Sequence, residues 1–152
     1  LEWNADASVP WELLDDPLHG GIRALVGDRN RVYRSSPALY TQDFDSAGFQ
    51  WIDANDRDGN VFSYLRWGSD GSSLACVLNM SAAPHENYRI GLPHAGAWRE
   101  VVNTDADSYG GSGVGNLGVV QAISGDWHGQ PAYAQITLPP LAALWFAPDD
   151  QG

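Results

Sequence analysis

Basic residues, cysteines and long apolar runs are all scarce in this chain of 152 residues. Only 8 residues are lysine or arginine against 19 aspartates and glutamates, and the formal net charge of -11 argues against a partner built from phosphates, such as nucleic acid. No apolar run approaches the ~20 residues of a membrane span, and the chain does not open on a basic segment followed by an apolar core. We therefore expect a soluble, cytoplasmic protein that binds neither nucleic acid nor membrane.

Cys76 is the single cysteine, which excludes a disulfide within the chain. It alternates with Leu74, Leu78 and Met80 along a predicted strand, so we expect a buried and inert thiol rather than a nucleophile, which needs a polar, exposed setting. The first residue is Leu1 and not methionine, which is consistent with a mature, cleaved or excised fragment.

A helix is predicted over residues 15–34. Asp16 is its expected N-cap, Pro17 suits the first helical position, and 35–37 (SSP) end it. Glycines 20, 21 and 27 cost about 1 kcal/mol each relative to alanine if they lie in the interior, so the helix needs a packing partner. Its apolar stripe, at spacings of three, four and seven, consists of Leu18, Ile22, Leu25, Val26, Val32 and Tyr33.

Beyond Phe44 the pattern changes to short alternating runs separated by turn signals, which is typical of an antiparallel β-sandwich. The predicted strands are 49–55, 60–68, 73–81, 87–92, 98–105, 119–123, 133–139 and 141–148. No helical periodicity follows residue 40. Residues 1–40 thus offer one apolar helix and no sheet to cover it, so the stripe either lies on the sandwich or is the exposed edge of a missing domain.

Two stretches resemble ligand-binding loops. Residues 113–118, GVGNLG, fit the dinucleotide pattern G-x-G-x-x-G, but a strand-like segment follows them instead of a helix, so a compact surface loop is the better interpretation. Residues 53–60, DANDRDGN, would place Ala54 and Leu65 at two ligand positions of an EF-hand, and neither can bind calcium. We predict a hairpin turn at Asp58-Gly59 instead.

Other chemistries find little support. No pair of carboxylates is singled out for glycosidase chemistry, the four histidines lack zinc-ligand spacing, and no serine stands in G-x-S-x-G. We predict no catalytic residue, no metal and no cofactor. Among the seven tryptophans, Trp51 and Trp145 lie in apolar strands and are assigned to the core, whereas Trp98 and Trp127, flanked by Gly, Arg and His, are the candidates for stacking on a sugar.

Three strings carry a specific likeness to a family: WREVVNTDADSYGGSGVGNLG at 98–118, DDPLHGGIRALVGDRNRVYRSSPAL at 15–39 and FQWIDANDRDGNVFSYLRWG at 49–68. With them, nearly the whole chain resembles the C-terminal part of bacterial glycogen branching enzymes, members of the α-amylase superfamily. The resemblance implies that 1–44 are the tail of a catalytic (β/α)₈ barrel with its last helix, that 45–148 are an all-β sandwich of the α-amylase C-terminal type, and that 149–152 are an acidic tail.

The resemblance also implies a function. Such enzymes transfer segments of α-1,4-glucan to form α-1,6 branches, and their catalytic carboxylates lie on earlier barrel strands without counterpart here. The expected partners are the upstream barrel and, through it, α-glucan. Glu2, Trp3 and Asn4 resemble the loop after the last barrel strand and are candidate sugar contacts.

One residue departs from the family. Arg29 stands where the family helix usually carries leucine, on the stripe expected to face inward, so either its guanidinium reaches the edge or this helix docks differently. A stand-alone carbohydrate-binding module remains the second hypothesis, and a small enzyme with unrecognised carboxylates the third.

Overall fold

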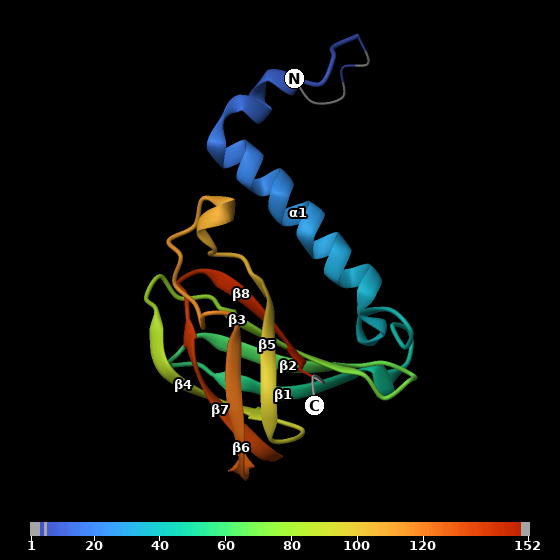
Figure 1. The fold of residues 1–152 in the computed structure, drawn as a ribbon, viewed down its shortest axis with the longest axis vertical. Coiled ribbons are helices and arrows are strands. Elements are labelled where there is room, and N and C mark those ends of the chain that lie inside the picture. The colour runs from blue at the N-terminus through green and yellow to red at the C-terminus, as the bar shows by residue number, and fades with distance from the viewer. Residues whose placement is uncertain (1–3, 5, 150–152) are drawn as a thin grey trace.

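Residue 4 and residues 6–149 are described by the structure, a computed structural model. One long helix leans beside an eight-stranded β-sandwich, and a loop with a short 3₁₀ turn rises from the sandwich to meet the helix (Figure 1). The antiparallel sandwich preceded by a single α-helix confirms the predicted fold class.

Helix α1 spans Pro17–Ser35, and its first turn is stabilised by an N-cap residue. The carboxylate of Asp16 accepts hydrogen bonds from the backbone N–H groups of Leu18 (2.8 Å) and His19 (3.4 Å), two of the donors that no helix can satisfy internally. Proline at the first helical position has no N–H to leave unpaired. The cap and the end of the helix match the prediction from sequence.

All eight predicted strands are present. They are β1 Phe49–Asp56, β2 Val61–Trp67, β3 Ser73–Asn79, β4 His85–Leu92, β5 Gly96–Asn103, β6 Val119–Trp127, β7 Gln130–Leu138 and β8 Ala142–Pro148. The turn between β1 and β2 confirms the hairpin predicted around Asp58-Gly59. Four short 3₁₀ turns, η1 Trp11–Asp15, η2 Pro37–Leu39, η3 Ser46–Gly48 and η4 Asp107–Tyr109, complete the described elements.

The strands form one curled sheet in the order β1-β2-β3-β8-β5-β6-β7-β4, with every pair antiparallel. The two layers are joined at β6, since residues 119–122 pair with β5 and residues from Ile123 onward pair with β7. Strands β1 and β4 are the two edges, and the curl of the sheet brings them into contact. This leaves a seam along one side of the sandwich.

The core lies between the two layers. Its largest fully buried side chains are Trp98 and Phe146, and alternate residues of each strand point into it. A second, smaller cluster lies on the outer face of β3, where Leu74 and Cys76 pack under Ala38 of η2. Cys76 is 1% exposed, as predicted, and burial raises the pKa of its thiol to about 12.

Candidate functional site

The first candidate feature is the contact between helix α1 and the loop that precedes β6. Gly21 is the one buried residue of α1, and a Cβ placed on it would overlap the backbone carbonyl of Tyr109. The Tyr109 hydroxyl donates a 2.7 Å hydrogen bond to the carboxylate of Asp28, two turns further along the helix. That bond, with a second from Arg31, holds the pKa of Asp28 below its usual range. We call these contacts the Gly21–Tyr109 clip.

The glycine-rich string forms this loop and not a nucleotide site. Strand β6 follows it, as predicted, where a dinucleotide fingerprint requires a helix. Gly113 has φ 76°, a left-handed conformation that glycine adopts without strain, and its N–H donates to the carbonyl of Asp105 (2.8 Å). The Asp105 carboxylate in turn accepts hydrogen bonds from the backbone and hydroxyl of Ser112. The loop is therefore folded by its own polar groups.

Asn116 ties the far end of the loop to the sandwich. Its Oδ1 accepts from the N–H of Thr137 (2.8 Å) and its Nδ2 donates to the carbonyl of the same residue (3.1 Å), so the side chain pairs with β7 as a neighbouring strand would. The carboxylate of Glu100 accepts from Asn116 through both the backbone N–H (3.1 Å) and Nδ2 (2.6 Å). The loop thus links strands β5 and β7 to helix α1 through hydrogen bonds.

Helix α1 exposes the larger part of its apolar stripe. Leu18 is 64% exposed, Ile22 60% and Val26 46%. Arg29 lies on the same exposed stripe, so its guanidinium is not buried. The helix contacts the sandwich through the adjacent face, where Gly21 is buried and Leu25, Asp28 and Val32 are half-buried. The sandwich therefore does not bury Arg29, and the expectation that this side of the helix faces a further domain stays a prediction.

A second exposed patch lies on the outer side of β1 and β2. Trp51 is 53% exposed, which corrects its assignment to the core. Its ring meets Phe49 edge-on at 5.0 Å, and Phe49 stacks on Tyr64 at 5.2 Å. The reason is the alternation of β1, in which the neighbouring Ile52 takes the inward position. Trp145 is half-buried against the smaller cluster.

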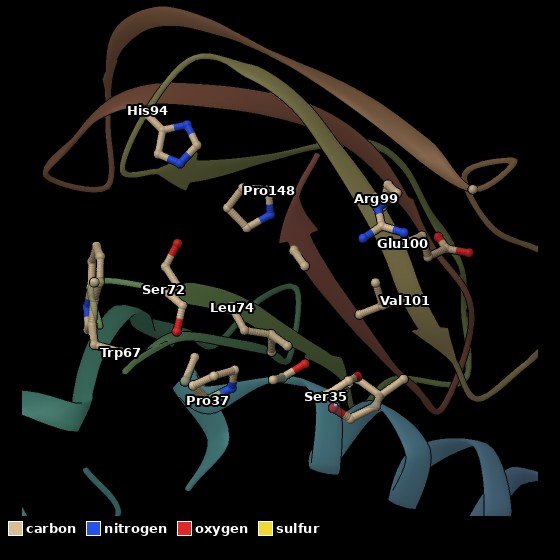
Figure 2. A pocket seen from close by; sticks show the side chains of 17 residues that line it. Ser35, Pro37, Trp67, Ser72, Leu74, His94, Arg99, Glu100, Val101 and Pro148 are labelled. Carbon is tan, nitrogen blue, oxygen red and sulfur yellow. Dashed lines mark hydrogen bonds between the residues drawn. The ribbon is translucent and has the colours of Figure 1, made fainter. Parts of the chain in front are cut away.

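A groove of about 710 Å³ lies where the end of α1 meets the sandwich. Figure 2 shows Trp67 and Ser72 on one side of it, Arg99 and Glu100 on the other, and Pro148 between them. Apolar and polar groups share this lining, and the guanidinium Nε of Arg99 lies 3.2 Å from the carboxylate of Asp149, with which it pairs. The groove belongs to the junction of helix and sandwich.

Those predicted sugar contacts that the structure describes do not form one site. Glu2 and Trp3 lie outside the described residues, and Asn4 is exposed, with its Oδ1 accepting from the backbone of Asp6. Trp98 is 0% exposed and its Nε1 donates to the carbonyl of His94, so it is a core residue and offers no face to a sugar. Of the two tryptophans, Trp127, 37% exposed at the end of β6, keeps the predicted accessibility.

The clip residues were missed because their partners are 81 residues or more apart in sequence. The available signal was the pair Gly20-Gly21 inside a predicted helix, which was interpreted only as a weakness of that helix. Among the described residues, no three His, Cys, Asp or Glu side chains are grouped as metal ligands. Of the helices in the same part of the chain, none has the length and apolar character that crossing a bilayer requires.

Comparison with known proteins gives two findings. Residues 51–149 match the α-amylase C-terminal all-β domain. The curated relatives include the 1,4-α-glucan branching enzymes GlgB of Frankia casuarinae (56% identical over 97% of this chain and 18% of that protein), Nocardia farcinica (55%, over 96% and 20%) and Thermobifida fusca (52%, over 97% and 20%). The chain therefore spans about a fifth of the length of these relatives, and the predicted resemblance is confirmed.

Proposed function

The chain belongs to the family of α-amylase C-terminal all-β domains, and from this premise we propose that it is the C-terminal part of a 1,4-α-glucan branching enzyme. In this proposal residues 45–148 form the sandwich and residues 1–44 complete the edge of a catalytic barrel that lies upstream. The parent enzyme transfers segments of α-1,4-glucan to form α-1,6 branches. The free thiol of Cys76 suits the reducing cytoplasm, which we propose as its location.

The observation that carries the proposal is the exposed stripe of Leu18, Ile22 and Val26. An amphipathic helix is ordinarily stabilised by burial of its apolar face, and contiguous apolar patches on a protein surface mark interaction sites. Here the sandwich holds the helix by a different face, through the clip at Gly21 and Tyr109. The stripe is thus available for the barrel that the relatives' greater length implies.

Two acidic residues near the clip are engaged by fixed hydrogen-bond partners. Asp28 is bound by Tyr109 and Arg31, and Glu100 is bound by Asn116. Branch transfer through a glycosyl-enzyme requires two carboxylates facing one sugar. We propose that the catalytic groups lie upstream and that this chain alone makes no branches. The loop of Glu2, Trp3 and Asn4 stays a proposed sugar contact.

A chimera tests the proposal. The matching C-terminal segment of the Frankia branching enzyme is replaced by this chain, and formation of α-1,6 branches from amylose is measured by debranching and chain-length analysis. We expect the chimera to be active, the chain alone to be silent, and Ile22→Asp to lower activity or heat stability because it puts a carboxylate into an apolar interface.

The matched control is Ile123→Asp, since Ile123 is also exposed but lies on β6, away from the stripe. It should leave the chimera unchanged. Branch formation by the isolated chain would contradict the proposal, as would a chimera in which Ile22→Asp and Ile123→Asp behave alike.

The stand-alone carbohydrate-binding module is the second candidate. One observation favours it: Trp127 remains partly exposed and lines a polar hollow.

A further inference from the structure

A hollow of about 750 Å³ lies along the seam between the edge strands β1 and β4, beside the β6–β7 turn. Two side-chain hydrogen bonds, and the close approach of one histidine to a carboxylate, join its walls. The hydroxyl of Tyr88 donates to the carboxylate of Asp56 (2.9 Å), the Nε2 of His85 lies 2.9 Å from the carbonyl of Gly59, and that of His128 lies 3.6 Å from the carboxylate of Asp53. These contacts fix the two walls of the hollow relative to each other.

The lining decides which class of ligand fits. Three carboxylates, Asp53, Asp56 and Glu86, stand against one guanidinium, that of Arg89, so phosphate and other anions are disfavoured. Pro84 is the one aliphatic side chain in the lining, which excludes a lipid or an apolar peptide segment. No three acidic or histidine side chains of the described chain are grouped to hold a cation. A neutral molecule rich in hydroxyl groups remains.

Hydrogen-bonding groups are free around the hollow. Within the described residues, the side chains of Asn55, Glu86 and Asn87 have no hydrogen-bond partner, and neither does the guanidinium of Arg89. The Nδ1 of His128 is buried and also without a partner. Asn55, Glu86 and Asn87 are exposed, so their amide and carboxylate groups are accessible to the paired donors and acceptors of sugar hydroxyls.

An aromatic side chain stands at the rim in a fixed orientation. The Nε1 of Trp127 donates to the carbonyl of Arg89 (2.8 Å), and the Arg89 guanidinium lies between the rings of Trp127 (4.6 Å) and Tyr133 (4.7 Å). Because these contacts fix both side chains before any ligand arrives, little conformational entropy is lost on binding. The exposed part of the indole is available to the apolar face of a sugar ring.

The backbone of β4, at this edge of the sheet, contains a β-bulge. The pairing of β4 with β7 shifts register between His85 and Tyr88, and Asn87 within this bulge has φ 55°. Bulges redirect side chains and are common next to binding sites. The left-handed backbone is one that asparagine tolerates better than most residues.

From this geometry we propose that the seam hollow is a binding site for a neutral oligosaccharide, whose hydroxyl groups bond to Asn55, Glu86, Asn87 and Arg89 and whose ring contacts Trp127. The oligosaccharide class follows from the lining alone. That the sugar is an α-1,4-glucan rests on the proposed function. Bound there, a glucan chain would be held on the sandwich while its end is free to reach a distant catalytic site.

The test is NMR titration of the ¹⁵N-labelled chain with maltoheptaose, with cellohexaose and inorganic phosphate as comparison probes. We expect saturable shifts with maltoheptaose at residues 53–56, 85–89 and 127–128, and none with phosphate. Asn87→Gly keeps the left-handed backbone and should weaken binding about threefold to tenfold, the effect of one or two hydrogen bonds. Trp127→Ala should weaken it by about tenfold or more.

Trp11→Ala is the matched control, because Trp11 is exposed on η1, remote in sequence from every lining residue, and should leave the affinity unchanged. If Trp127→Ala disturbs the fold, the affinity of Asn87→Gly for maltoheptaose still tests the site. Absence of shifts with maltoheptaose, shifts outside the hollow, or equal losses in Trp11→Ala and Trp127→Ala would overturn the site. Binding of cellohexaose alone would overturn the α-glucan assignment. The chimera tests the docking stripe at Ile22, so failure of the proposed function can be distinguished from failure of this sugar site.

Discussion

Two glycines on the same helix allow the attachment of α1 to be measured. Gly21→Ala places a Cβ 2.7 Å from the carbonyl carbon of Tyr109, and the obstacle is backbone that no rotamer change can clear. Gly27→Ala places a Cβ where nothing lies within 4 Å. Both substitutions replace glycine by the best helix former, so each gains up to about 1 kcal/mol of helix propensity. The difference in helix docking between the two variants therefore measures the effect of the close contact between Gly21 and Tyr109.

The magnitude follows from the geometry. Carbon atoms in van der Waals contact lie about 3.5–4 Å apart, so Gly21→Ala requires the helix and loop to separate by about 1 Å. Overpacking of this kind costs typically about 1–3 kcal/mol. Because the propensity gain is common to both variants, we expect docking in Gly21→Ala to be weaker than in Gly27→Ala by that amount.

Amide hydrogen exchange is the appropriate assay. Helix α1 carries three glycines that lower its intrinsic stability, so its amides exchange when it leaves its packing partner. Helix amides should exchange about 5- to 150-fold faster in Gly21→Ala than in Gly27→Ala. Amides of β3 and β8 in the sandwich core, which contact the helix little, should be equally protected in both. Equal protection of the helix in the two variants would refute the clip.

Two further measurements address buried groups. Cys76, with its pKa near 12, should resist a thiol reagent at neutral pH and react only in denaturant; rapid native labelling would contradict its burial. Burial lowers the pKa of His128 below 6.5, so the unfolded chain binds more protons and stability should be greatest above pH 6.5 and fall as the pH drops below it. His128→Asn, which suits φ 50°, should flatten this part of a urea-unfolding pH profile.

The strands could be predicted because alternation is a local property. The same alternation also indicates which side chains point inward. Trp98 is followed by Arg99, and adjacent strand residues face opposite sides, so an exposed arginine predicts a buried tryptophan. Trp51 is followed by Ile52, which takes the core and leaves the indole outside. Polarity of neighbours is thus evidence for burial in a strand.

The functional features could not be predicted in this way, since each joins distant parts of the chain. Gly21 meets Tyr109 only after the sandwich has formed, and Asp53 meets His128 only because the curled sheet brings its edges together. The apolar periodicity of the first forty residues predicted a helix without a partner in this chain, and the family resemblance agreed with it. Neither of them predicted the face by which the helix is held.

Under the proposed function, that face would let the sandwich act on the upstream barrel through the helix. At 100° per residue, the stripe around Ile22 lies roughly a quarter of a turn from the face that carries Gly21 and Asp28. A body docked on the stripe therefore leaves the clip intact, and the helix is fixed from two sides at once. Because Asn116 anchors the clip loop to β7 and to Glu100 of β5, a displacement of those strands moves the helix with them. In the chimera, Asn116→Ala should therefore lower branching activity even though Asn116 lies outside the docking stripe, whereas Ile123→Asp should not.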